Sequence, residues 1–207
     1  MGARQPFTRH DGIVVPLLRS HIDTDQIVPR QFLKRLERSG FGQFLFHDWR
    51  RGSDNQPRPD FVLDQPVYAG ASVLVTGANF GCGSSREHAA WALADFGVRV
   101  ILAPSFADIF FANAVVNGLV PATITAAAAA ALADRAARCA PYTVCVDLEG
   151  CRLSGDGGFS EPFGIDAVSR GRLLDGRDEI DRLLDDTAAI TDYERRRGSG
   201  LAPVVAL

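Results

Sequence analysis

The chain has 207 residues, of which 46% are hydrophobic and 23% are charged, and its formal net charge is −3. This composition is typical of a globular protein and excludes a disordered chain, a collagen-like fibre and a coiled coil. No apolar run reaches the roughly 18 residues of a transmembrane helix, and there is no basic surplus of the kind that nucleic-acid binding requires, so neither a membrane nor a nucleic acid is an expected partner.

The first third of the chain mixes one strand with polar loops. Residues 13–18 are apolar and predict a short strand. The polar residues 21–29 follow, and their Asp and Thr side chains suit turns and helix caps. Residues 30–38 predict a helix, and residues 50–60, rich in Pro, Gly, Asn and Asp, predict a surface loop.

A strand and a well-marked helix come next. The β-branched run 72–76 predicts a buried strand. Ser84 followed three residues later by Glu87 fits a capping box, which predicts a helix starting at Ser84. Gly97 ends that helix, and residues 98–102 predict a second buried strand.

The same alternation continues toward the C-terminus. Residues 104–118 predict a helix and residues 119–124 a third strand, and this order indicates parallel pairing with right-handed crossovers. The Ala-rich residues 125–139 predict another helix. Residues 142–154 predict a hairpin that turns at positions 149 and 150, and residues 165–197 are expected to be mostly helical.

The four cysteines do not form a metal-binding pattern. Cys82, Cys139, Cys145 and Cys151 include no Cys-x-x-Cys pair and no zinc spacing with histidine. Residues 1–9 lack the apolar segment of a signal peptide, so reduced thiols in a cytoplasmic protein are expected. We therefore expect no metal ion and no iron–sulfur cluster bound by this chain.

Residues 77–88 carry the strongest chemical signal. Three glycines precede a helix N-terminus, Ser84 and Ser85 supply hydroxyl groups, and Arg86 places a cation where an anion would be held. No lysine precedes Ser84, as a Walker A loop requires, and Arg86 stands where a dinucleotide fingerprint has its third glycine. Alternatively, Ser84 is only a helix cap and Arg86 only a surface ion pair.

Residues 79–89, NFGCGSSREHA, resemble the signature of the swivel domain of the aconitase superfamily. More narrowly, the chain resembles the small subunits of bacterial 3-isopropylmalate dehydratase over roughly residues 7–195. Further segments support this resemblance in the same order: residues 23–33 (DTDQIVPRQFL), 46–50 (FHDWR), 59–63 (PDFVL), 103–110 (APSFADIF) and, more weakly, 163–166 (FGID).

The resemblance implies an α/β fold, namely a three-layer β/β/α swivel domain with a mainly parallel sheet, plus C-terminal helices. Residues 1–160 would form the swivel domain, and residues 161–207 a helical extension packed on it.

The resemblance also implies a hydro-lyase that is active only together with a large subunit. The large subunit would carry a [4Fe-4S] cluster with one open iron, which acts as a Lewis acid on the leaving hydroxide. The implied reaction interconverts 2-isopropylmalate and 3-isopropylmalate, both small dicarboxylates, through 2-isopropylmaleate in leucine biosynthesis. Two alternatives remain: a related hydro-lyase acting on citraconate and 2-methylmalate or on homoaconitate, and a non-catalytic anion-binding module.

The implied site roles are carried over residue by residue. Ser84 would be the catalytic base, as an alkoxide, while Ser85 and Arg86 hold a substrate carboxylate. Thr24 and Asp25 would line the pocket or orient Arg86, unless they only hold a loop through Asx-turn hydrogen bonds.

Four further residues are weaker candidates. Gly83 lies within the motif, and His88 follows Ser84 by four residues on one face of the expected helix, although a structural role for it is favoured. Phe32 and Leu33 lie where the family's substrate-selecting loop is expected, and they would favour an apolar substituent.

Overall fold

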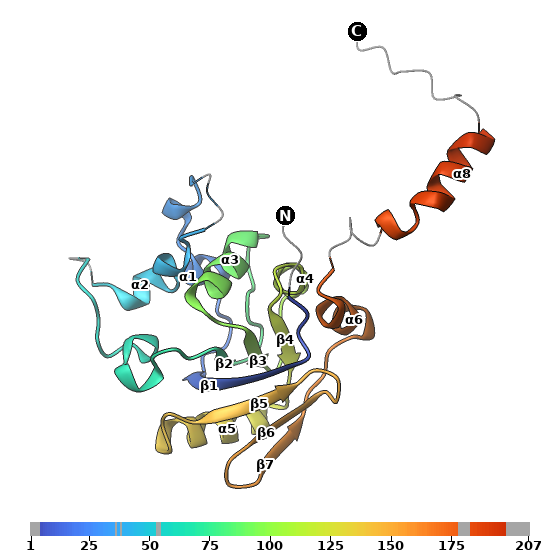
Figure 1. Cartoon of the computed structure of the whole chain (residues 1–207). Helices are drawn as coiled ribbons and strands as arrows, with labels where there is room; N and C mark the ends of the chain where they lie inside the picture. The colour runs from blue at the N-terminus through green and yellow to red at the C-terminus, as the bar shows by residue number, and fades with distance from the viewer. Residues whose placement is uncertain (1–4, 36, 38, 53–54, 178–182, 198–207) are drawn as a thin grey trace.

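The computed structural model describes residues 5–35, 37, 39–52, 55–177 and 183–197. Seven strands form one curled sheet in the order β4-β3-β2-β1-β5-β6-β7 (Figure 1). Their bounds are β1 (Arg9–Leu17), β2 (Val73–Thr76), β3 (Val100–Ala103), β4 (Val120–Thr123), β5 (Thr143–Asp147), β6 (Arg152–Gly155) and β7 (Phe159–Pro162).

Strand β1 joins two kinds of pairing. Its first half, from Arg9 to Ile13, pairs antiparallel with β5, and its second half, from Val14 to Leu17, pairs parallel with β2. Strands β3 and β4 continue the parallel part, and β6 and β7 continue the antiparallel part. The expected parallel sheet is therefore confirmed for β1–β4, and the expected hairpin is confirmed as β5–β6.

Helices connect many of these strands along the chain and pack against the sheet. In the described part of the chain, the helices longer than a single turn are α3 (Glu87–Phe96), α4 (Asp108–Val116), α5 (Ala126–Arg138), α6 (Ala167–Asp175) and α8 (Thr187–Arg197). The short ones are α1 (Thr24–Ile27) and α2 (His47–Arg50), with 3₁₀ turns η1 (Arg30–Phe32), η2 (Gly42–Phe44), η3 (Val62–Asp64) and η4 (Pro66–Tyr68).

Two hydrophobic cores lie on opposite faces of the parallel strands. Because side chains alternate along a strand, Val73 and Val75 of β2 enter one core and Leu74 enters the other. The first core includes Leu132 of α5 and Val144 of β5, so the antiparallel strands cover that face together with α5. Helix α3 and the α1–η4 segment cover the opposite face, which gives the β/β/α layering (Figure 1).

The structure corrects the expected start of the helix after β2. Helix α3 begins at Glu87, and Arg86 is its N-cap, with extended backbone and no side-chain cap. The capping box predicted for Ser84 and Glu87 is therefore wrong. The physical reason is tertiary, because the carbonyl of Ser84 accepts a hydrogen bond from Thr24 of a remote loop.

The helix expected over residues 30–38 is also largely wrong. A single 3₁₀ turn, η1, forms there, and residues 36 and 38 lie outside the described residues. Pro29 precedes the turn, and the ring of Phe32 stacks on Phe44 at a centroid distance of 4.1 Å. Packing of that ring, and not a helical repeat, accounts for the turn.

The boundary expected at residue 160 falls inside β7. Beyond it, Phe163, which precedes α6, and Leu173 of α6 are buried in the core that holds β5 and β6, whereas α8 has no buried residue. The division into a swivel domain and a C-terminal extension stays a prediction.

Candidate active site

Two loops meet at the carboxyl edge of the parallel strands. One follows β1 and the other follows β2, and parallel neighbours bring such loops to the same edge. The N–H of Gly81 donates to the carbonyl of Ile22 at 2.8 Å, and the N–H of Thr24 donates to the carbonyl of Cys82 at 2.9 Å. These bonds hold residues 23–33 and 79–89 side by side, and these are the two segments on which the resemblance to the aconitase superfamily mainly rests.

Two glycines shape the second loop in different ways. Gly81 has φ +76°, and a Cβ there would lie 2.1 Å from Cγ of Phe110 in α4, so only glycine fits. Gly83 has φ +92°, but a Cβ there would meet its nearest atom, Cβ of Asp23, at an ordinary 3.5 Å. Gly81 is thus required by packing, and Gly83 by backbone conformation alone.

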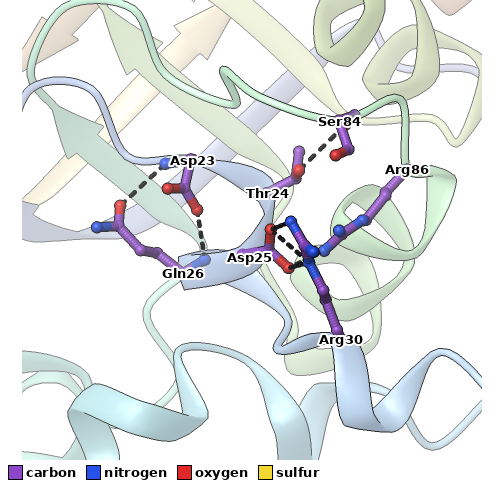
Figure 2. Close-up of polar contacts among 7 residues, drawn as sticks. All are labelled: Asp23, Thr24, Asp25, Gln26, Arg30, Ser84 and Arg86. Carbon is purple, nitrogen blue, oxygen red and sulfur yellow. Dashed lines mark hydrogen bonds and ion pairs between the residues drawn. The ribbon is translucent and has the colours of Figure 1, made fainter.

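A capping box does occur at the site, but in helix α1. The N–H of Gln26 donates to Oδ1 of Asp23 at 2.7 Å, and the N–H of Asp23 donates to the side-chain oxygen of Gln26 at 2.9 Å. This reciprocal pair begins the helix at Thr24. It thereby fixes Thr24 and Asp25 in the first turn, facing the second loop (Figure 2).

Thr24 connects α1 to the serine pair. Its side chain is buried, and its hydroxyl donates to the backbone carbonyl of Ser84 at 3.0 Å (Figure 2). Ser84 and Ser85 are themselves exposed. The backbone of Ser84 is therefore held by the protein, while both serines are exposed residues that a substrate can reach.

Asp25 and Arg86 form the charged part of the site. The Arg86 side chain, only 10% exposed, donates from Nη1 to Oδ1 of Asp25 (Figure 2). Arg30, 75% exposed, donates to the same carboxylate from Nε and Nη2 at 3.1 Å. Burial by itself would raise the pKa of Asp25, but the bonds and charges of Arg86 and Arg30 outweigh it and lower that pKa. Asp25 is thus held ionised.

His88 lies in an aromatic cluster. Its ring centroid is 4.6 Å from that of Trp91 and 5.3 Å from that of Phe41. Burial lowers the pKa of His88, more than the neighbouring Glu87 raises it. The expectation that His88 shares a helical face with Ser84 is wrong, because Ser84 precedes α3. These contacts favour a structural role for His88.

Phe32 and Leu33 lie close to the site in the chain but pack inward. Besides its stack on Phe44, the Phe32 ring meets the His47 ring edge-on at a centroid distance of 4.8 Å. Leu33 is partly buried against the hydrophobic core that contains Leu74. Their part in substrate selection stays a prediction.

Comparison with known proteins identifies the family. The family described as the Aconitase C-terminal domain matches residues 4–127, which include both loops of the site. The 3-isopropylmalate dehydratase small subunit of Geobacillus kaustophilus is 53% identical over 93% of this chain and 97% of the relative. The chain belongs to the family of 3-isopropylmalate dehydratase small subunits.

Further relatives and a solved structure agree with this family. The 3-isopropylmalate dehydratase small subunit of Koribacter versatilis is 51% identical, over 91% of this chain and 97% of the relative. The crystal structure of 3-isopropylmalate dehydratase from Methanocaldococcus jannaschii superimposes with a TM-score of 0.65 over 90% of this chain and 99% of that chain, at 22% identity. The latter supports the fold, and membership of a small-subunit family implies a large-subunit partner.

The described residues of this small-subunit chain supply no ligand set for an iron–sulfur cluster. Among them, no group of three or more His, Cys, Asp or Glu side chains is arranged to hold a metal ion. All four cysteines are unpaired thiols. In the same part of the chain, no helix is both long and apolar enough to cross a membrane.

A cavity of about 330 Å³ lies beside the end of β1, apart from these side chains. Pro16, Leu17, Leu18, Arg19, Asp60, Phe61 and Val62 line it. None of the predicted site residues lines it. The hydrogen bonds that join Thr24 to Ser84 and Arg86 to Asp25 locate the site better than this cavity does.

Sequence reasoning missed Arg30. The resemblance singled out Phe32 and Leu33, which follow it, and an arginine at the start of the helix predicted over residues 30–38 has the pattern of an ordinary surface residue. The available signal was its position five residues after Asp25, which a compact turn can bring within reach of the carboxylate.

Proposed function

We propose that this chain is the small subunit of a 3-isopropylmalate dehydratase that interconverts 2-isopropylmalate and 3-isopropylmalate through 2-isopropylmaleate in leucine biosynthesis. The observation that carries the proposal is the pairing of Asp25 with Arg86 beside two exposed serines. The proposal is further supported by relatives that bear this name at about half identity.

The reaction places two demands on the protein. The proton to be removed sits on carbon next to a carboxylate and is only weakly acidic, so it needs a positioned base. Negative charge then develops toward that carboxylate, and it needs preorganised positive groups. The residues around Ser84 meet both demands.

Ser84 is the base in this proposal. Its Oγ takes the proton from the substrate carbon during dehydration and returns a proton to the neighbouring carbon during rehydration. An ordinary hydroxyl is too weak an acid to ionise, so the alkoxide requires stabilisation. The N-terminus of α3, which begins three residues later, and the guanidinium of Arg86 supply positive potential there. Thr24 fixes the backbone from which Ser84 projects.

Arg86 and Ser85 bind a substrate carboxylate in this proposal. A planar guanidinium matches a carboxylate through two parallel hydrogen bonds, and the hydroxyl of Ser85 adds a third donor. Asp25 orients Arg86, and the lowered pKa of Asp25 keeps this contact charged throughout the neutral pH range. The deeper position of Arg86 screens it from water and strengthens its attraction for an anion.

The partner in this proposal is a large subunit that holds the [4Fe-4S] cluster, because the described residues here lack a ligand set for one. No residue of this chain is assigned to the cluster. We also propose a cytoplasmic location, which suits four thiols that form no disulfide.

The test is an anaerobic assay of the complex with its co-expressed large subunit and reconstituted cluster. Formation of 2-isopropylmaleate from 3-isopropylmalate is followed for wild type, Ser84→Ala and Arg86→Lys, with Ser154→Ala as the control for an exposed serine outside the site. We expect Ser84→Ala to lower kcat about 10²–10⁴-fold and Ser154→Ala to leave it unchanged.

Two other outcomes of that assay would overturn the proposal in favour of a different function. Turnover of citraconate or homoaconitate but not of isopropylmalate would keep the site and change the substrate. An intact complex that turns over none of these acids would indicate a non-catalytic anion-binding module.

A further inference from the structure

Arg30 is a second arginine on the carboxylate of Asp25. Its Nε lies 3.1 Å from both Oδ1 and Oδ2, and its Nη2 lies 3.1 Å from Oδ2. Its side chain is 75% exposed. Exposed ion pairs contribute little to stability, and Asp25 already has Arg86 as a partner. The close contact of Arg30 therefore needs an explanation other than stability.

The backbone that carries Arg30 is fixed by its neighbours. Pro29 before it is buried, and the N–H of Leu33 donates to the carbonyl of Arg30 at 3.1 Å to close the turn η1. Phe32, in the same turn, is held by its stack on Phe44. Arg30 thus reaches Asp25 from a short, anchored turn, which limits the positions its guanidinium can take.

The two arginines divide the oxygens of Asp25 unequally. Arg86 reaches Oδ1 through Nη1, whereas Arg30 occupies Oδ2 and shares Oδ1 (Figure 2). An arginine alone with a carboxylate commonly closes on both oxygens as a fork. Within the described part of the chain, Nε and Nη2 of Arg86 have no hydrogen-bond partner, so they are available to a ligand.

We propose that Arg30 is a positioning residue that occupies the outer oxygen of Asp25, restricts Arg86 to a contact through one nitrogen, and so leaves the other donors of Arg86 for a substrate carboxylate. The identity of that carboxylate rests on the proposed function. Without Arg30, Arg86 closes on both oxygens of Asp25, and the substrate must compete with Asp25 for the same donors.

Another carboxylate, Asp23, lies near Arg30 and adds to its attraction. Oδ1 of Asp23 is already engaged as the cap of α1, where it accepts from the N–H of Gln26. Asp25 is therefore the carboxylate that Arg30 contacts through hydrogen bonds.

Crystal structures of the complete complex, wild type and Arg30→Gln, test the geometry without reference to any substrate. We expect Arg86 to touch Asp25 through one nitrogen in wild type and through two nitrogens in Arg30→Gln. A one-nitrogen contact in both proteins would overturn the proposal.

Kinetics of the same complexes test the consequence. We expect Arg30→Gln to raise KM about tenfold, equivalent to about 1.4 kcal/mol, with kcat changed less than about twofold. Arg30→Lys should restore part of the loss, since it returns a charge but not the fork. The matched control is Arg138→Gln, because Arg138 pairs with Asp134 on α5 and is similarly exposed. An unchanged KM, or a kcat that falls as far as KM rises, would contradict a positioning role.

An Asp25→Asn background shows whether Arg30 acts through Asp25. We expect Arg30→Gln to raise KM no further in that background, whereas a full further rise would mean that Arg30 contacts the substrate itself and would overturn the proposal. If the wild-type complex does not turn over isopropylmalate, the proposed function fails, but the comparison of crystal structures still decides the role of Arg30.

Discussion

The hydroxyl of Thr24 donates to the backbone carbonyl of Ser84 at 3.0 Å and so ties the loop after β1 to the loop after β2. The two residues are 60 positions apart in the sequence. Because the bond ends on the backbone, it fixes the position of Ser84 without engaging its hydroxyl. Thr24 thus supports the proposed base through its backbone, and a direct contact of Thr24 with substrate stays a prediction.

Thr24→Val tests this support. Valine has nearly the shape of threonine but cannot donate, so the carbonyl of Ser84 loses its partner and stability should fall by about 1 kcal/mol. We expect kcat of the complex to fall about tenfold, and thermal unfolding to report the loss of stability. Thr24→Ser, which keeps the hydroxyl, is the control and should stay close to wild type. Equal kcat in wild type and Thr24→Val would show that Ser84 needs no such support.

The two serines should have separate kinetic effects. Ser85→Ala removes the proposed donor to the substrate carboxylate, so it should raise KM about tenfold and change kcat little. Ser84→Ala removes the proposed base and should act mainly on kcat. Steady-state kinetics of both variants in the complex check this division, and a larger loss of kcat in Ser85→Ala than in Ser84→Ala would exchange the two roles.

The two glycines of the loop should differ in stability. Gly81→Ala drives a Cβ into the Phe110 ring at a positive φ, so we expect a loss of about 3 kcal/mol or no folded protein. Gly83→Ala should lower the free energy of unfolding by only about 1 kcal/mol, because its positive φ is unfavourable for alanine but its Cβ has room. Urea unfolding compares the pair, and similar losses at the two positions would contradict the packing argument.

His88 should make the folded chain sensitive to mild acid. Burial lowers the pKa of His88 below its ordinary value of 6.5, so the unfolded chain takes up the proton first as the pH falls. The contribution of neutral His88 to stability is therefore complete above pH 6.5 and is lost as the pH falls through the lower, folded-state pKa.

Two measurements check this behaviour. NMR titration of the His88 ring should give a midpoint below 6.5. The difference in unfolding free energy between wild type and His88→Gln should shrink as the pH falls below 6.5. Burial also lowers the pKa of His10, but His10 is present in both proteins, so its contribution cancels in this difference. A midpoint at or above 6.5 would show that the aromatic cluster does not desolvate the ring.

Most elements of the fold were predictable because local patterns specify them. Apolar, β-branched runs predicted the second half of β1 and strands β2 to β4, and the Ala-rich stretch with Thr125 at its N-cap formed α5 as expected. The misplaced elements are those where remote contacts override a local pattern. Ser84 and Glu87 have the spacing of a capping box, yet the contact with Thr24 holds Ser84 outside the helix.

The sequence by itself was enough to predict the candidate site, because Ser84, Ser85 and Arg86 form one continuous motif and its chemistry depends on their types. It could not determine how the charges pair. Asp25 meets Arg86 only because β1 and β2 are parallel neighbours, and Arg30 joins them only because η1 turns back toward α1. Contacts between distant segments depend on how the sheet brings its loops together, so the tertiary structure alone decided them.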